Sequence, residues 1–248
     1  MYAKLKTALI DLAKENDLLE SEINITAKIL TPEEAIGKTE RKDFPLLQGK
    51  EFLMEANFKN ALGQAFTDAP SNFKGKLKKI FELELKNNSD RALFIATLNA
   101  VTRYVDAAEK TIHCKNEGPE LCAGEIVKTI IDKYNADIKI GIVGFQPAII
   151  DNFSKNLPAQ NLKVIDLDKE NINKKKYGLL IWDGRKMAED LFKISDVILA
   201  TGSTIVNNSL SHLIFLSNKY QKPLYFYGTT IAGTAKILDL KRLCFQAS

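Results

Sequence analysis

The chain has 248 residues, of which 45% are hydrophobic and 27% are charged, and its formal net charge is +4. This composition is that of an ordinary globular protein with one large domain or two small ones. The weak positive excess is spread along the chain and argues against nucleic acid as a partner. No segment approaches the roughly 20 apolar residues of a membrane span, and the N-terminus lacks the apolar core of a signal peptide. We therefore expect a cytoplasmic protein without a membrane partner.

The first 109 residues predict a small α+β domain. Apolar residues at helical spacing predict helices at residues 2–19, 76–85 and 89–105. Alternating apolar and polar residues predict strands at residues 23–30, 51–58 and 63–67. The segment 37–45 between the first two strands is too polar for a core and is expected to be a long loop.

Residues 110–248 predict a Rossmann-like α/β domain, because short apolar runs alternate with helical stretches. The expected strands are 138–143, 162–167, 178–182, 197–200 and 223–227. The expected helices are 123–134, 147–155, 185–192, 205–219 and 233–238. Such alternation is typical of a doubly wound parallel sheet, in which right-handed crossovers bring the carboxyl ends of the strands to one edge. Ligands of these sheets bind at that edge, so the loops that follow the strands are the candidate binding residues.

The first of these loops contains Gly144, Phe145, Gln146 and Pro147. Gly144 permits a tight turn, and Pro147 suits the first turn of the following helix. The free N–H groups at the start of that helix would favour a phosphate or carboxylate. The full dinucleotide pattern G-x-G-x-x-G is absent, so a plain turn between strand and helix is the alternative.

Asp166 ends the second strand of this half. It lies about 20 residues after the glycine turn, where Rossmann proteins place an acid that holds ribose hydroxyls. This spacing favours a nucleoside-type cofactor. The alternative is that Asp166 caps a neighbouring turn or helix.

Two further loops are rich in glycine and small hydroxyl residues. The fourth strand is followed by Thr201, Gly202, Ser203 and Thr204, with Asn207 one helical turn later. The fifth strand is followed by Gly228, Thr229 and Thr230. Both loops would offer N–H and O–H donors at the binding edge. The alternative for the first loop is that Ser203 or Thr204 caps the next helix, a role that is compatible with ligand binding.

A separate group of residues suggests a metal. His113, Cys114, Glu117 and Cys122 carry the imidazole, thiol and carboxylate groups that bind zinc and softer metals. The spacing of the two cysteines is not that of a zinc finger, whose paired ligands are closer together. A covered loop with packed thiols and a catalytic thiol are the alternatives. With Cys244 the chain has three cysteines, and this odd number favours reduced thiols over disulfides.

Several of these segments together resemble the putative heavy-metal chelation domain family. The segments are 111–114, 144–147, 201–207 and 227–233, with the motif Thr-Gly-Ser-Thr-Ile-Val-Asn as the most specific, and 63–68 in the first half. The resemblance implies an enolase N-terminal-like α+β domain packed on a Rossmann-like domain, with an active site in the cleft between them. It also implies that polar residues of the first domain, such as Glu40, Arg41 and Thr67, close the site from the other side.

Three hypotheses about function follow. The first is a protein that binds a transition or heavy metal ion, or a small anionic metabolite, in the cleft between two domains. The second is an enzyme that depends on a nucleotide or on S-adenosylmethionine, for which Asp166 and the Gly144 turn are the features. The third is a non-catalytic protein that binds a partner, and a homodimer is the expected oligomer. The residues name no substrate and no reaction.

Overall fold

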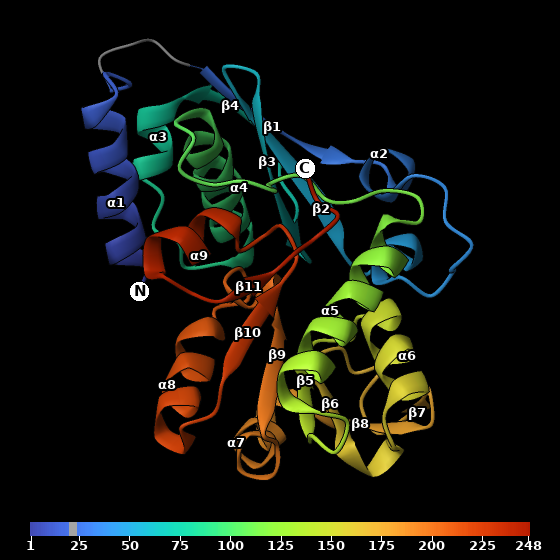
Figure 1. Ribbon diagram of the computed structural model, residues 1–248. Helices are drawn as coiled ribbons and strands as arrows, with labels where there is room; N and C mark the ends of the chain where they lie inside the picture. The colour runs from blue at the N-terminus through green and yellow to red at the C-terminus, as the bar shows by residue number, and fades with distance from the viewer. Residues whose placement is uncertain (20–23) are drawn as a thin grey trace.

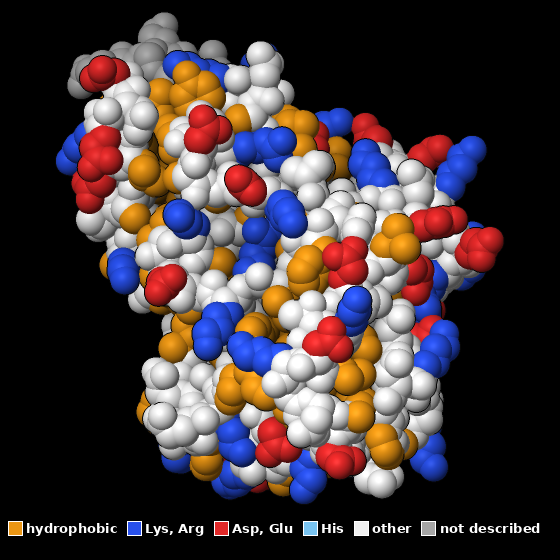
Figure 2. Space-filling view, viewed as in Figure 1, with side chains coloured by type: hydrophobic (Ala, Val, Ile, Leu, Met, Phe, Trp, Pro, Cys, Tyr) orange, Lys and Arg blue, Asp and Glu red, His pale blue; other side chains and the backbone are white. Residues whose placement is uncertain are grey.

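The structure is a computed structural model that describes residues 1–19 and 24–248. Two sheets dominate it: a four-stranded sheet of the first half in the order β3-β2-β1-β4, and a seven-stranded sheet of the second half in the order β11-β10-β9-β5-β6-β8-β7. Figure 1 shows the two sheets one above the other, with helices packed around both. Figure 2 shows acidic and basic side chains interspersed over the face in view, without a continuous basic stripe.

The four-stranded sheet is antiparallel throughout. Its strands are β1 (Asn24–Leu30), β2 (Phe52–Phe58), β3 (Ala61–Thr67) and β4 (Phe73–Lys76). Lys59 and Asn60 form the turn between β2 and β3, and both have positive φ, as the tightest hairpin turns require. Residue 23, the first residue of the strand expected at 23–30, lies outside the described residues.

Helix α4 (Asn88–Tyr104) is the central helix of the first half, and most of its length is buried against β2 and β3. The side chain of Asn87 caps it by accepting a hydrogen bond from the backbone N–H of Asp90. Gly63 on β3 allows the close approach, because a Cβ there would lie 2.5 Å from the carbonyl oxygen of Ala96. Helix α1 (Tyr2–Glu15) and helix α3 (Leu77–Phe81) flank α4.

The seven-stranded sheet is parallel except for β7 (Lys175–Lys176), which is antiparallel to β8. The parallel strands are β5 (Ile140–Val143), β6 (Leu162–Asp166), β8 (Leu179–Asp183), β9 (Val197–Thr201), β10 (Leu224–Tyr227) and β11 (Arg242–Leu243). In chain order they are arranged 3-2-1-4-5-6, the arrangement of a doubly wound sheet. The order reverses between β5 and β9, so the switch point lies between their carboxyl ends.

Helices cover both faces of this sheet. They are α5 (Gly118–Tyr134), α6 (Pro147–Asn156), α7 (Gly184–Ile194), α8 (Leu210–Tyr220) and α9 (Ala232–Leu238). Residues of α5 and α6 share one apolar core with Ile140 and Ile142 of β5, whereas residues of α7 and α8 share the other core with Val143. Alternate residues of a strand therefore face opposite helical layers, as a buried parallel strand requires. The α/β class expected from the sequence is confirmed.

Some element boundaries differ from the expectation. Directly after the strand expected at 23–30, Thr31 and Glu34 form a capping box that starts helix α2 (Pro32–Ile36). The helix expected at 123–134 begins earlier, at Gly118, with Pro119 in its first turn.

Three predicted helices are shorter than expected. The helix expected at 2–19 ends at Glu15, and the one expected at 205–219 begins at Leu210, after the short 3-10 helix η3 (Gly202–Thr204). The helix expected at 76–85 is only α3, because Phe73–Lys76 joins the sheet as β4. The segment expected as a polar loop contains no strand and ends in the 3-10 helix η1 (Pro45–Gln48).

The two halves of the chain pack against each other directly. Each of the two apolar cores contains residues from both halves. The segment after β11 returns to the loop before α5, where the backbones of Ile112 and Ser248 exchange hydrogen bonds of 2.8 and 3.1 Å. The domain boundary expected between residues 109 and 110 stays a prediction. Over the described part of the chain, no helix is both long and apolar enough to cross a membrane.

Candidate functional site

A cavity of about 930 Å³ lies where the carboxyl ends of β5, β6, β9 and β10 face the four-stranded sheet. Its volume is in the range of small-molecule sites. It lies at the switch point of the doubly wound sheet, the position at which such sheets bind ligands. Every ligand residue expected from the sequence lines it: Gly144, Phe145, Gln146, Asp166, Thr201, Gly202, Ser203, Thr204, Asn207, Gly228, Thr229 and Thr230.

The β9 loop (residues 201–207) is held mainly by its own hydroxyl groups. The Thr201 hydroxyl accepts a hydrogen bond from the Ser203 backbone N–H, and the Thr204 hydroxyl donates to the Thr201 carbonyl oxygen. Thr201 therefore caps η3, and neither Ser203 nor Thr204 caps α8, which begins at Leu210. The Asn207 side chain accepts from the backbone and hydroxyl of Ser209. The loop leaves fewer free donors than its composition suggests.

The β10 loop (residues 228–230) is different, because one of its hydroxyl groups has no partner. Thr230 accepts a hydrogen bond from the backbone N–H of Phe66, which ties the loop to β3. The Thr229 side chain is 1% exposed and lines the cavity, yet its Oγ1 has no hydrogen-bond partner. A buried hydroxyl without a partner is costly, so a ligand that bonds to Thr229 would recover that cost.

The glycine turn after β5 is held by Asp166. Gly144 has φ of 94°, and a Cβ there would lie 2.7 Å from Cγ2 of Thr201. The Asp166 carboxylate accepts hydrogen bonds of 2.6 Å from the backbone N–H of Phe145 and of Asp168. Burial raises the pKa of Asp166, although these hydrogen bonds oppose the shift. Of the two roles expected for Asp166, the stabilisation of a turn is the one its contacts display.

The amide of Gln146 has a similar structural role. Its Oε1 accepts a hydrogen bond of 2.9 Å from the Ile149 backbone N–H and so caps α6, while Pro147 occupies the first turn. The N-terminus of α6 therefore already has an acceptor. Phe145 stacks on Tyr177, and the ammonium of Lys176 lies 4.4 Å from the Phe145 ring.

The four-stranded sheet contributes an acid that the sequence did not reveal. Glu51 precedes β2 and lines the cavity, as does Asp68 after β3. Burial, and to a smaller extent the nearby carboxylates of Asp166, Asp68 and Asp168, raise the pKa of Glu51 to about 7. Sequence reasoning missed Glu51 because nothing in a lone acid before a strand shows that it faces a second sheet. A carboxyl group with a pKa near neutrality in a cavity is typical of a functional site.

Basic groups lie at the rim of the cavity. Lys50 forms ion pairs with Asp168 at 3.1 Å and with Glu170 at 2.8 Å. Arg185 donates to the carbonyl oxygen of Leu167. Of the first-half residues expected to close the site, Thr67 lines the cavity. Arg41 instead forms ion pairs with Glu120 on α5 and Asp151 on α6. Glu40 is not among the lining residues.

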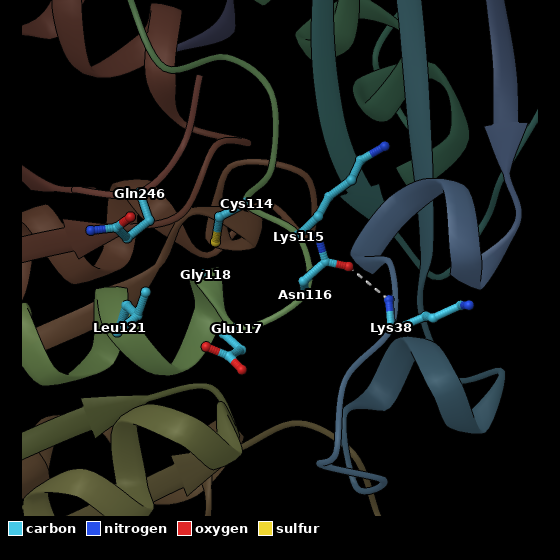
Figure 3. A pocket seen from close by; sticks show the side chains of 8 residues that line it. All are labelled: Lys38, Cys114, Lys115, Asn116, Glu117, Gly118, Leu121 and Gln246. Atoms are coloured by element: carbon cyan, nitrogen blue, oxygen red, sulfur yellow. Dashed lines mark hydrogen bonds between the residues drawn. The ribbon is translucent and has the colours of Figure 1, made fainter.

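The expected metal residues do not converge on one point. His113, Cys114 and Cys122 line the cavity, whereas Glu117 lines a second hollow of about 500 Å³. In Figure 3 the Glu117 carboxylate points away from the sulfur of Cys114. Within residues 1–19 and 24–248, no three His, Cys, Asp or Glu side chains are placed to hold a metal ion together. The four residues therefore do not form a four-ligand zinc site.

His113 is a partly buried neutral imidazole. Its ring packs edge-on against Phe66, with 5.2 Å between ring centroids, and its buried Nδ1 has no hydrogen-bond partner. Burial is the main cause that lowers its pKa to about 4. The ring is therefore uncharged at neutral pH, with one nitrogen protonated and the other not.

The structure brings Cys122 together with Cys244, which was not among the expected metal residues. The backbone N–H of Phe245, the residue that follows Cys244, donates to the Cys122 sulfur at 3.5 Å, and both cysteines line the cavity. The Cys244 thiol lowers the pKa of Cys122 to about 6, while burial raises the pKa of Cys114 to about 12. The sequence showed Cys244 only as a third cysteine. Nothing in it indicated that the C-terminal segment lies beside α5.

The fold and the cavity define an α/β protein whose cavity lies between a doubly wound sheet and a small antiparallel sheet. Residues 129–239 match the model of the DUF364 family, which is described as putative heavy-metal chelation. This match confirms the family resemblance that the sequence motifs carry.

Two solved structures of DUF364 proteins of unknown function are similar to the chain. The one from Pyrococcus horikoshii is 16% identical with a TM-score of 0.53, over 92% of this chain and 78% of that chain. The one from Desulfitobacterium hafniense DCB-2 is 13% identical with a TM-score of 0.48, over 75% of this chain and 72% of that chain. The likeness to the Pyrococcus protein supports the α/β fold. A comparison with curated proteins found no match.

Proposed function

We propose that the protein binds a small anionic metabolite in the cavity at the switch point. The observation that carries this proposal is that the loops after β5, β6, β9 and β10 and the opposing edge of the four-stranded sheet all line one cavity of about 930 Å³. A doubly wound sheet binds its ligands at this position, so the fold and the cavity support the same site.

The lining groups indicate the chemistry of the metabolite. The β9 and β10 loops offer hydroxyl and backbone donors, which suit a carboxylate or phosphate. Glu51 and Asp166 lie in the same cavity and suit hydroxyl or amino groups. The ligand that matches both walls is an anion that also carries hydrogen-bond donors, such as a hydroxy acid, an amino acid or a sugar phosphate.

The experiment uses the unpartnered hydroxyl of Thr229. Thermal shift and calorimetry on the whole chain first find a ligand in a panel of hydroxy acids, amino acids, sugar phosphates and nucleosides. Thr229→Val should then weaken its binding about tenfold, because one hydrogen bond to a charged group is lost. Thr97→Val is the matched control, because Thr97 is equally buried and unpartnered but does not line the cavity. Equal affinities of both variants would contradict the proposal.

Heavy-metal chelation is a second candidate function, and the approach of three thiols to one wall of the cavity favours it. Cys114, Cys122 and Cys244 all line the cavity. Elemental analysis of untagged protein tests this candidate: a near-stoichiometric metal that is lost in the double variant Cys114→Ser, Cys122→Ser would support it. The same metal content in that variant would contradict a role for these thiols.

A nucleoside-type cofactor is one outcome of the same panel. Both carboxylate oxygens of Asp166 accept hydrogen bonds from backbone N–H groups, so its contacts do not favour a ribose over other ligands. Binding of a nucleoside that Asp166→Ala weakens tenfold or more would shift the proposal to this class.

A further inference from the structure

Three cysteines from three separate segments of the chain line the same cavity. Cys114 lies in the loop before α5, Cys122 lies one turn into α5, and Cys244 follows β11. A Cβ at Gly118 would lie 3.6 Å from the Cys114 sulfur and 3.9 Å from Cβ of Gln246. The start of α5 therefore lies between the loop and the C-terminal segment, and Figure 3 shows the Cys114 sulfur directed toward it.

The C-terminal segment is held in place by contacts that do not involve sulfur. The Arg242 guanidinium donates to the carbonyl oxygens of Glu109 and Lys110, and the Lys110 ammonium donates to the Phe245 carbonyl oxygen at 3.2 Å. These contacts fix Cys244 on either side, so its position beside Cys122 does not depend on a bond between the two thiols. Both thiols are 9% exposed and line the cavity, from which an ion can reach them.

We propose that Cys122 and Cys244 form a two-sulfur site for a thiophilic monovalent cation such as Cu(I) or Ag(I). The inference rests on the metal-binding candidate function and deepens it, because it assigns the ligands and the class of ion. The backbone N–H of Phe245, the residue that follows Cys244, donates to the Cys122 sulfur at 3.5 Å, so the two cysteines lie beside each other on the cavity. A pair of thiols is the donor set that soft ions accept. Zinc requires four ligands in a tetrahedron, and the described residues offer no third and fourth ligand at this point.

Binding requires each thiol to lose its proton. The sulfur–hydrogen bonds of Cys122 and Cys244 are replaced by sulfur–metal bonds, and one proton from each thiol passes to solvent. The ion keeps its oxidation state, so no oxidant or reductant takes part. The product is a bis-thiolate complex with one negative charge, and affinity rises with pH because protons compete with the ion.

The test is a titration of the reduced full-length chain with Ag(I), which does not change oxidation state. Absorption of the silver–thiolate complex measures binding, and the acid released in a weakly buffered solution measures the protons. We expect one silver ion per chain, together with release of the protons that the two thiols still carry at the pH of the titration. Cys122→Ser and Cys244→Ser should each weaken binding about 100-fold or more.

Cys114→Ser is the matched control, because it removes a third thiol on the same wall and should leave tight binding intact. His113→Ala and Glu117→Gln should leave it intact as well. Tight binding that survives Cys244→Ser, or that is lost in Cys114→Ser alone, would overturn the two-sulfur site. Zinc bound as tightly as silver would overturn the assignment of ion class while leaving metal binding itself in place.

A measurement on the unmodified chain covers the case in which a variant fails to fold. Silver should protect Cys122 and Cys244, but not Cys114, from alkylation, as read by mass spectrometry of the digested protein. Equal labelling of all three cysteines with and without silver would overturn the site. Binding of the metabolite to Cys244→Ser, measured in parallel, separates a failure of the thiol site from a failure of the metabolite site.

Discussion

Glu51 is a carboxyl group in the cavity whose charge changes near neutral pH. Its carboxyl group is buried beside other carboxylates, and its pKa is raised from 4.5 to about 7. A raised pKa means that the folded state binds this proton more tightly than the unfolded state. The stability that this group contributes is therefore present below pH 4.5 and is lost as pH rises from 4.5 to about 7.

Glu51→Gln tests this linkage. Glutamine remains uncharged, so the variant should be more stable than the wild type at pH 8, by about 1–3 kcal/mol. At pH 5 the wild-type carboxyl is already protonated, and the two proteins should differ little. Urea unfolding of both proteins at the two pH values measures the difference. A stability difference that is equal at pH 5 and pH 8 would show that burial does not shift this group.

The sequence indicated that Asp166 accepts hydrogen bonds at the end of a strand, but it did not indicate which groups donate them. Its position about 20 residues after a glycine turn fitted either a ribose contact or a turn. Only the spatial approach of the β5 and β6 ends shows that two backbone N–H groups point at its carboxylate. Cys244 illustrates the same limit, because its neighbour Cys122 is distant in sequence and no periodic pattern connects the two.

Asp166→Asn should destabilise the fold by about 1–3 kcal/mol. An asparagine side chain has one acceptor oxygen where aspartate has two, so one of the two buried N–H groups loses its partner. Urea unfolding measures the loss. If stability is unchanged while metabolite binding falls, the carboxylate serves the ligand and not the turn.

At the scale of elements, the sequence predicted the types of the long helices and strands because their apolar periodicity is regular. The prediction of element boundaries failed where the same residue type can either end one element or begin the next. No helix was predicted to begin at Pro32 or Pro119, whereas each lies in the first turn of a helix. The segment 73–76 was assigned partly to a helix, because nothing local shows that β1 needs an edge partner there.

The packing of α4 on β3 gives a prediction at this scale. Gly63→Ala should destabilise the fold by about 3 kcal/mol or more, since the added Cβ would overlap the backbone of Ala96 and Ala100, which cannot move aside. Gly124→Ala is the matched control: its Cβ on α5 would meet only Asn152 at 3.9 Å, and alanine favours a helix by about 1 kcal/mol. Thermal unfolding compares the two. Equal effects of both substitutions would contradict the close contact between α4 and β3.

At the scale of the whole molecule, the sequence predicted an α/β protein with its candidate ligand loops at one edge of a parallel sheet. It could not predict how the first half meets that edge, because contacts between distant segments leave no periodic signal. The structure places the four-stranded sheet opposite the loops and adds Glu51 and Asp68 to the cavity. The buried side chain of Asn99 on α4 makes polar contacts that join the two halves there.

Asn99 bonds to both halves at once. Its amide nitrogen donates to the carbonyl oxygens of Gln64 on β3 and of Thr229 and Thr230 in the β10 loop, at 2.8, 3.3 and 3.0 Å. Its amide oxygen accepts from the backbone N–H of Gly233 at 2.8 Å. Together with the hydrogen bond from the Phe66 backbone N–H to Thr230, this carboxamide fixes the β10 loop relative to the four-stranded sheet.

Asn99→Leu should lower both stability and ligand affinity. Leucine is of similar size but leaves these buried backbone groups without partners, which costs about 2–4 kcal/mol. The β10 loop then loses its anchor, so the metabolite should bind several-fold more weakly. Urea unfolding and calorimetry on the same samples measure the two effects. Thr97→Val on the same helix is the control, and it should lower neither stability nor ligand affinity. A loss of stability without any loss of affinity would show that the position of the β10 loop does not depend on the contact between the halves.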